Sequence, residues 1–399
     1  MTAPDIELTI AREPLPMAER LACIRALRHA IAEHATELAE AAAAVSARPV
    51  AEKLVSEVLP LADACRWLER HAARVLAPRR CGSRGRPFWM RGVTFEVQRQ
   101  PFGAVLVIGP ANYPLFLPAV QALHAFVAGN SVLLKPAPGT RGVAALFARL
   151  FDCDWLTVLP ESVEAARGAI ARGVDKVIFT GSSENGRDVL AEIAATNTPA
   201  VMELSGEDAV LVFADADLDL VERALRFGTQ LNDGETCIAP RRLIVVDSVA
   251  DEWDSPLPVE RVPDEETAIE RASAGRFALG VSIFSRDIAK AQAMAARIES
   301  GFVLINDLIV PTADPRMPFG GVRASGFGVT RGDEGLLEMT HPHVVAVSRG
   351  AARPHFDEPS QDDAPFFAAY IRAAHGPLRY SALREFAGAL MRKIKSKKP

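Results

Sequence analysis

The chain has 399 residues, 49% of them hydrophobic and 24% charged, and its formal net charge is −5. This length predicts two or three domains with a large buried core, and the mild acidity argues against a nucleic-acid partner. The five cysteines are scattered, which argues against a disulfide framework and against zinc-knuckle spacing. No secretory leader or membrane-spanning run is visible. We therefore expect a cytoplasmic protein without a structural metal.

The first part of the chain predicts helices. Apolar residues recur at helical spacing in two stripes, and the alanine run 41–44 extends the helix of the first stripe. Residues 81–87 are rich in Gly, Arg and Pro and predict a loop. Alternating apolar and polar residues over 88–100, around Arg91 and Gly92, predict a hairpin. The stripes are Leu21, Ile24, Leu27, Ile31, Leu38 and Leu54, Val58, Leu61, Cys65, Leu68.

From residue 104 onward, strands and helices alternate. This alternation predicts parallel sheets covered by helices on both faces, the dinucleotide-binding type of architecture. Strands are expected at 104–108, 131–134, 156–159, 176–179, 201–204, 209–212, 242–246, 281–284, 303–306 and 344–347. Helices are expected at 115–128, 141–151, 162–172, 184–195, 218–230, 265–274 and 288–300, with a connection at 247–263 and an irregular Gly-rich segment at 311–335.

Cys237 is the strongest candidate for a chemical role. It follows Gly234, which permits an unusual backbone turn, and precedes Ala239-Pro240, where a strand can begin. A cysteine becomes a nucleophile when its surroundings favour the thiolate. Taken alone, such a residue is more often buried and inert, and we interpret the other four cysteines in that way.

Several short motifs around Cys237 occur in a fixed order along the chain. They are Gly109-Pro110-Ala111-Asn112-Tyr113-Pro114, Lys135-Pro136, Phe179-Thr180-Gly181-Ser182 with Gly186, Glu203-Leu204-Ser205-Gly206, Gly234-Glu235-Thr236-Cys237, Phe284-Ser285-Arg286-Asp287, Ile305-Asn306, and Pro318-Phe319-Gly320-Gly321 with Ser325-Gly326. Each motif is weak alone. Together, over residues 101–345, the chain resembles the NAD(P)-dependent, hydrolytic type of the aldehyde dehydrogenase superfamily.

This resemblance implies a covalent catalytic site. Cys237 would attack the aldehyde carbon, and the amide of Asn112 with the Cys237 backbone N–H would hold the oxyanion. Glu203 would activate the water that releases a carboxylic acid, which argues against transfer to coenzyme A. A structural carboxylate at a strand end is the alternative for Glu203.

The resemblance also implies a site for NAD or NADP. Lys135 would reach the adenosine ribose, while Gly181 and Ser182 would begin the helix whose N-terminus meets the pyrophosphate. Gly186 would let that helix pack closely; an ordinary N-capped helix is the alternative. Pro110 and Leu204 belong to the same predicted cofactor site. Pro138 stands where relatives often carry a ribose-binding Glu, which leaves NADP open beside NAD.

The implied fold is α/β. It has a Rossmann-type dinucleotide-binding domain at 101–203 preceded by helices at 1–85, a reduced α/β catalytic domain at 204–343, a hairpin flap at 86–100, and a strand and tail helix at 344–399. The flap, with strand 344–347, implies a homodimer. The catalytic domain is expected to be smaller than in relatives because of a deletion after Cys237. Relatives have a Glu-x-Phe-Gly-Pro motif there that anchors the nicotinamide, and this chain passes through 247–263 without it.

Two further departures bear on function. Glu235 replaces a Gln of the family and is expected to raise the pKa of the nearby thiol. The tail helix over 378–399 places Leu383, Phe386, Leu390 and Ile394 on one face and ends in basic residues. We favour a solvated helix end there over contact with an anionic membrane.

The predicted activity is NAD(P)-dependent oxidation of a small-molecule aldehyde to its acid. A catalytically impaired relative and a thiol esterase that needs no cofactor remain as alternatives. The sequence does not identify the aldehyde.

Overall fold

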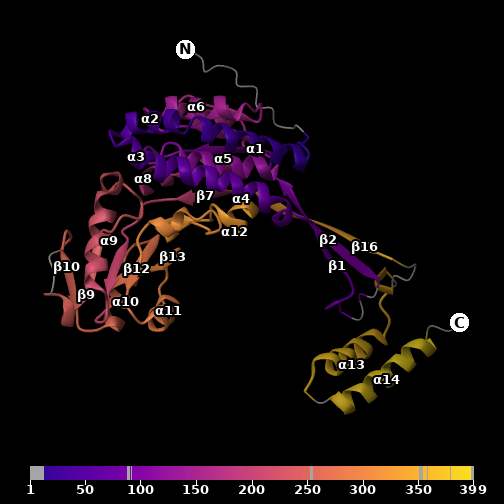
Figure 1. The fold of residues 1–399 in the computed structure, drawn as a ribbon. Coiled ribbons are helices and arrows are strands. Elements are labelled where there is room, and N and C mark those ends of the chain that lie inside the picture. Colours follow the sequence, from indigo (N-terminus) through magenta and orange to yellow (C-terminus); the bar gives the residue numbers. More distant parts are fainter. Residues whose placement is uncertain are drawn as a thin grey trace. The chain divides into compact units, whose positions relative to one another are not determined.

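In the computed structural model, the described residues are 13–87, 90, 92–251, 255–349, 354–356, 358–377 and 379–396. The chain forms two compact units (Figure 1). The larger unit comprises Met1–Cys81 and Phe95–Val345, and the smaller comprises Gly82–Thr94 and Ala346–Pro399. The candidate site lies wholly in the larger unit.

The first sheet of the larger unit is parallel except at one edge. Its strand order is β15-β7-β6-β3-β4-β5. From β3 the chain adds β4 and β5 on one side and then β6 and β7 on the other, so the order reverses between β3 and β6. Ligands of such sheets bind at this switch point, beyond the carboxyl ends of the strands. The strands are β3 (Ala104–Ile108), β4 (Ser131–Lys135), β5 (Leu156–Val158), β6 (Lys176–Thr180), β7 (Ala200–Glu203) and the antiparallel β15 (Gly326–Phe327).

Helices cover both faces of this sheet. Along β3, Val105 and Val107 join one buried core and Leu106 and Ile108 join another, because neighbouring side chains of a strand point to opposite faces. The first core contains α1 (Met17–Glu33), α2 (Ala35–Ser46), α4 (Leu59–Val75), α5 (Phe116–Ala128) and α6 (Arg141–Phe151), which lie together in Figure 1. The second contains α7 (Val163–Ala171) and α8 (Ser183–Ala194).

Two details of the N-terminal helices differ from the prediction. The alanine run does not extend α1, because the chain turns at His34 and begins α2. Before α4, the short α3 (Val50–Lys53) continues into a π-helical turn at Leu54–Val58. Such turns widen a helix locally and are frequent at functional sites.

The second sheet contains five parallel strands in the order β10-β9-β8-β12-β13. Val210 faces the core beneath α9 (Leu218–Gln230), whereas Leu211 faces the core beneath α10 (Glu265–Ser273) and α11 (Ile288–Ala295). The strands are β8 (Ala209–Val212), β9 (Arg242–Val246), β10 (Val259–Val262), β12 (Gly280–Phe284) and β13 (Phe302–Ile305). The predicted α/β fold class is therefore confirmed, and the connection predicted at 247–263 contributes strand β10.

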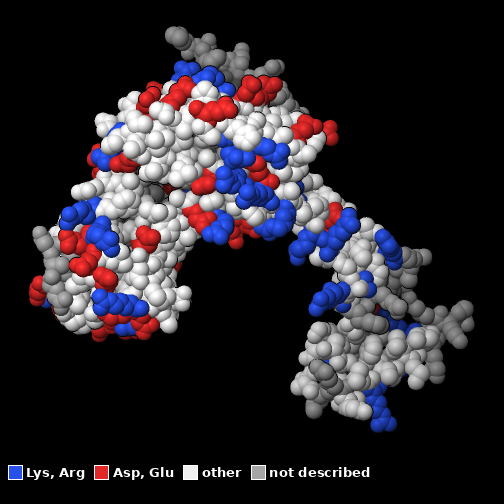
Figure 2. Space-filling model, in the orientation of Figure 1, with Lys and Arg blue, Asp and Glu red and all other residues white. Residues whose placement is uncertain are grey.

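Short elements complete the larger unit. They are the turns Leu231–Gly234, Asp247–Val249 and Val310–Ala313, the antiparallel pair β11 (Phe277–Ala278) and β14 (Val322–Arg323), and α12 (Gly332–Leu337). Acidic and basic side chains are interspersed over the visible surface of β9, β10 and α10 (Figure 2), where Glu260 pairs with Arg242 and Arg271.

A three-stranded sheet has the order β1-β2-β16. The predicted hairpin within 88–100 is wrong, because β2 (Val93–Pro101) pairs antiparallel with β1 (Arg79–Cys81). Its predicted turn includes Arg91, which lies outside the described residues. The predicted strand 344–347 is part of the longer β16 (Thr340–Ser348).

The smaller unit contains the turn Pro354–Phe356 and the helices α13 (Asp363–His375) and α14 (Arg379–Ser396). The predicted single apolar face of the tail helix is divided: Phe386 packs against Phe366 and Tyr370, whereas Leu383, Leu390 and Ile394 are exposed. Lys397 and Lys398 lie outside the described residues. No helix in the described part of the chain has both the length and the hydropathy to cross a membrane.

Candidate active site

A cavity of about 650 Å³ opens at the switch point of the first sheet. It reaches from the ends of β3, β4 and β6 to the loop that precedes β9. Of the predicted site residues, Pro110, Asn112, Lys135, Gly181, Ser182, Glu203, Leu204 and Cys237 line this cavity. Gly186 does not, because it lies one turn inside α8.

The loop that carries Cys237 has an unusual backbone. Asn232, Asp233 and Gly234 have φ angles of 52°, 53° and 70° in succession. Asn, Asp and Gly are the residues that adopt this left-handed conformation most readily. The chain then passes through Glu235 and Thr236 and presents a half-buried Cys237 to the cavity.

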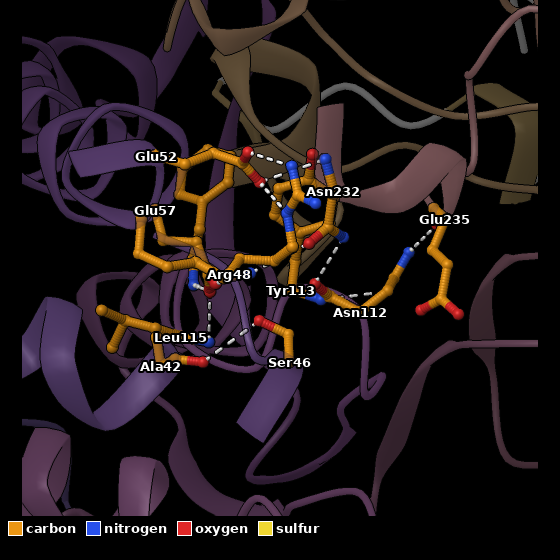
Figure 3. Close-up of polar contacts among 12 residues, drawn as sticks. Ala42, Ser46, Arg48, Glu52, Glu57, Asn112, Tyr113, Leu115, Asn232 and Glu235 are labelled. Carbon is orange, nitrogen blue, oxygen red and sulfur yellow. Dashed lines mark hydrogen bonds and ion pairs between the residues drawn. The ribbon is translucent and has the colours of Figure 1, made fainter. Parts of the chain in front are cut away.

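Buried polar contacts hold this loop against the N-terminal helices. Lys53 Nζ donates to Asn232 Oδ1 at 3.0 Å, and the Asn232 backbone N–H donates to Glu52 at 3.1 Å. Lys53 also pairs with Glu57 at 3.1 Å, and both side chains are completely buried. Figure 3 shows Asn232 between Glu52 and Asn112, and Asn232 Nδ2 donates to the Asn112 carbonyl at 2.9 Å.

The Asn112 side chain is oriented at both ends. Its Nδ2 donates to the Glu235 carbonyl at 2.7 Å (Figure 3), and its Oδ1 accepts from the Tyr113 backbone N–H at 3.0 Å. An amide nitrogen carries two hydrogens, so one of them is still available to a second acceptor. The Asn112 amide can therefore donate into the cavity without leaving its contact with the loop of Cys237.

Glu203 ends β7 and is buried in a polar pocket. Its carboxylate accepts from Thr180 Oγ1 at 2.9 Å, from Gln121 Nε2 at 3.1 Å, and from the Thr330 hydroxyl. Burial raises the pKa of Glu203 above its ordinary value, and these bonds together with the charge of Arg331 oppose the shift. A carboxylate with a raised pKa and fixed geometry is suited to act as a general base.

The surroundings of Cys237 keep its thiol protonated. Burial raises the pKa of Cys237 to about 12, and the charges of Glu203 and Asp208 act in the same direction. Arg331 lowers it. The sequence predicted that Glu235 would raise the pKa of Cys237. In the structure Glu235 is exposed to solvent, and Glu203 and Asp208 are the carboxylates that raise it.

Arg331 is the main residue that the sequence reasoning missed. It is buried with a φ of 63°, donates to the Thr312 carbonyl, and lies over the ring of Phe319 with 4.4 Å between guanidinium and centroid. No carboxylate lies within 4.0 Å of its guanidinium in the described ranges. A bulky residue with positive φ is strained, and such strain gathers at functional sites. An arginine between Thr330 and Gly332 carries no sequence signal of this position.

The first cavity also suits a dinucleotide. Lys135 is buried and lines this cavity. Among the described residues, no carboxylate lies within 4.0 Å of its ammonium group. The N-terminus of α8 is capped by Ser182, whose hydroxyl accepts from the Asn185 backbone N–H, and its dipole favours a phosphate. At Gly186 a Cβ would lie 2.5 Å from Leu204 Cδ2, so glycine allows the close packing that was predicted.

A second cavity, of about 360 Å³, meets the first at the thiol. Leu117, Thr236, Cys237 and Phe319 line both cavities. The sulfur can therefore be reached from two sides: one offers phosphate- and ribose-binding groups, and the other is lined mainly by apolar side chains.

The family model described as the aldehyde dehydrogenase family matches residues 11–257 and 255–345. The chain belongs to the aldehyde dehydrogenase family. Its recognition from ordered motifs is thus confirmed, and at 399 residues it is a somewhat shortened member.

Named relatives of this aldehyde dehydrogenase span most of its length. A 4,4'-diapolycopene aldehyde oxidase from Methylomonas sp is 29% identical, over 82% of this chain and 77% of the relative. The succinate semialdehyde dehydrogenase [NAD(P)+] Sad of Escherichia coli is 25% identical, over 82% of this chain and 88% of the relative.

Solved structures confirm the fold. The substrate-bound AldH of Staphylococcus aureus has a TM-score of 0.80 at 21% identity, covering 89% of this chain and 95% of that one. A succinic semialdehyde dehydrogenase from Streptococcus pyogenes in complex with NADP+ has a TM-score of 0.78 at 22% identity, covering 85% and 92%. At these sequence identities the similarity supports the fold and not a shared function.

Proposed function

We propose that this protein oxidises an aldehyde to a carboxylic acid with NAD or NADP as the acceptor. The observation that carries the proposal is that Cys237, Glu203 and Asn112 line one cavity, although they come from three distant parts of the sequence. The two relatives named above are an aldehyde oxidase and a semialdehyde dehydrogenase whose names give different aldehydes, which supports the reaction type and leaves the substrate open.

The Cys237 thiol adds to the aldehyde carbon, so that a C–S bond forms as the carbonyl π bond becomes an oxyanion. Glu203 lines the same cavity and is the base that takes the thiol proton, directly or through water. The second amide hydrogen of Asn112 and the Cys237 backbone N–H stabilise the oxyanion. One such donor is typically worth about 3–4 kcal/mol in the transition state.

When bound, a nicotinamide would supply the hydride acceptor, so that the thiohemiacetal carbon would lose a hydride and its C–O bond would become the carbonyl of a thioester. Glu203 first releases the thiol proton to solvent and then takes a proton from a water molecule, whose oxygen attacks the thioester carbon. The C–S bond breaks, the acid leaves, and the departing sulfur takes the proton from Glu203, which restores the thiol of Cys237. Thr180, Gln121 and Thr330 hold the Glu203 carboxylate in place for this step.

The dinucleotide is held by the groups at the switch point. Lys135 would hold the ribose, and the N-terminus of α8 at Ser182 would hold the pyrophosphate. Pro110, Gly181 and Leu204 shape the wall between them. Pro138 also lines the cavity and offers neither a carboxylate for the ribose hydroxyls nor a repelling charge, so either NAD or NADP is accommodated.

The test is dinucleotide reduction, followed by absorbance, over a panel of aldehydes with each cofactor. Reduction that is lost in Cys237→Ala supports the proposal. No reduction, with no dinucleotide binding by calorimetry, would favour the non-catalytic alternative. Turnover of an activated ester without added dinucleotide would favour the thiol esterase. A homodimer built through β2 and β16 is part of the proposal and is measured by light scattering.

A further inference from the structure

The second cavity changes character from one end to the other. Near Cys237 its walls are buried side chains, among them Phe116, Ile238 and Phe319. At its mouth the apolar side chains are exposed: Val55 by 63%, Leu59 by 55%, Phe227 by 42% and Val310 by 56%. Exposed apolar residues scattered singly are ordinary, but four gathered at one opening mark a binding surface.

The wall carries little that would bind a polar substrate. Arg331 is the one charged side chain among the described residues that line this cavity. Its guanidinium donates to the Thr312 carbonyl and lies against the rings of Phe319 and Phe116, whereas its Nε is buried without a hydrogen-bond partner among the described residues. Tyr113 bonds the Thr236 hydroxyl at 2.8 Å, so neither hydroxyl is left without a partner.

We propose that the substrate is an aldehyde carried on an extended apolar chain, with the chain in the second cavity and its far end against Val55, Leu59, Phe227 and Val310. This inference rests on the proposed function, which sets the carbonyl at Cys237. At roughly 30 Å³ per small non-hydrogen group in a liquid, a cavity of 360 Å³ has room for on the order of a dozen such groups. Longer chains extend over the exposed apolar mouth.

The inference predicts a chain-length profile. With saturated straight-chain aldehydes from propanal to dodecanal, kcat/KM should rise by about fourfold for each added methylene until the cavity is filled. Beyond about a dozen heavy atoms the rise should flatten. A matched polar series, in which the far end is a carboxylate, should be turned over at least about tenfold less well at lengths that carry this charge beyond Arg331 to the mouth, because the exposed apolar side chains there give it no partner.

A variant at the mouth tests the location of the chain. Leu59→Glu places a charge among the four exposed apolar residues and should reduce the dodecanal-to-propanal ratio of kcat/KM by about fivefold or more. Val163→Glu is the matched control, because Val163 is also 55% exposed but lies on α7, away from both cavities. It should leave the ratio unchanged.

The outcomes separate this inference from the proposed function. A flat or falling profile, or a preference for the carboxylate-bearing series, overturns the inference while leaving dehydrogenase activity in place. If no aldehyde reduces a dinucleotide, the proposed function fails. Calorimetry of dodecanoate against butanoate on the full-length Cys237→Ala protein still tests the cavity. Tighter binding of dodecanoate, weakened by Leu59→Glu and unaffected by Val163→Glu, supports the inference, and equal binding contradicts it.

Discussion

Lys53 Nζ lies 3.0 Å from Asn232 Oδ1, at a depth where the Lys53 side chain is completely buried. The contact joins the start of the π-helical turn to the loop of Cys237. Through Asn232 it continues to the backbone of Asn112, and through Glu57 to the backbone N–H groups of Leu115 at 2.7 Å and Phe116 at 3.2 Å. One buried ion pair thus positions both the cysteine loop and the segment that carries the asparagine.

Removing Lys53 should therefore destabilise the fold strongly. Lys53→Met leaves Glu57 as a buried carboxylate without its cation, which typically costs about 3–5 kcal/mol. Lys290→Met is the matched control, since its pair with Glu265 is partly exposed and is worth at most about 1 kcal/mol. The free energy of unfolding, measured with denaturant, compares them. Equal losses would show that the buried pair is not structurally important.

A second consequence concerns Asn112. Asn112→Ala removes the amide hydrogen offered to the oxyanion and should reduce kcat by about 100- to 1000-fold. Glu235→Gln is the control, because Asn112 bonds the backbone carbonyl of residue 235 and not its side chain. We expect it to change kcat by less than about twofold, a weak surface effect. A small loss in Asn112→Ala would assign the oxyanion to other donors.

The raised pKa of Glu203 gives a pH dependence with a defined sign. As a base, Glu203 works when ionised, so kcat should rise with pH through its raised pKa, and Glu203→Gln should remove this limb. The contribution of Glu203 to the free energy of unfolding depends on pH in the opposite direction. Between the ordinary and the raised pKa, the native state keeps a proton that the unfolded chain has lost. The stabilising contribution of Glu203 is therefore complete below about pH 4.5 and is lost as pH rises through the raised pKa.

The measurement follows from that sign. The free energy of unfolding of the wild type minus that of Glu203→Gln should be larger near pH 4 than near pH 8, values chosen on either side of the shift. The reverse order would mean that Glu203 is stabilised in its ionised form, and its role as a base with a raised pKa would be rejected.

The sequence predicted the residues of the first cavity better than the supports around them. The family was identified by the order of local motifs such as Phe179-Thr180-Gly181-Ser182 and Gly234-Glu235-Thr236-Cys237. All of the first motif and the last three residues of the second line the cavity. Lys53 and Glu57 are four residues apart, a spacing that usually indicates a solvated helix surface. Their burial depends on α5 and the cysteine loop, which are distant in sequence, so no local pattern predicts it. The apolar mouth at Leu59 and Val310 is hidden for the same reason.

Arg331 supplies the positive charge that opposes the rise in the pKa of Cys237 and Glu203. Arg331→Met should raise the pKa of both groups further. Alkylation of Cys237 near neutral pH should then be slower, and the rise of kcat with pH should move to higher pH. Arg331→Lys keeps the charge and should retain part of the rate. Arg316→Met, which removes an exposed arginine paired with Asp314, is the control. Equal alkylation rates in Arg331→Met and the wild type would show that the guanidinium serves packing only.

The packing of α8 sets the last prediction, which concerns the dinucleotide. In Gly186→Ala the new Cβ would lie 2.5 Å from Leu204 Cδ2 and 3.4 Å from Met202 Cε, so α8 or the wall at Leu204 must shift. Because the N-terminus of α8 faces the proposed pyrophosphate site, a displacement of a few tenths of an ångström weakens its hydrogen bonds. We expect the dissociation constant for the dinucleotide to rise by about tenfold, the equivalent of one charge-assisted hydrogen bond. Gly142→Ala on α6 is the matched control, because a Cβ there meets nothing within 4 Å. Calorimetric titration of both variants decides the matter: unchanged affinity in Gly186→Ala would place the pyrophosphate away from this helix.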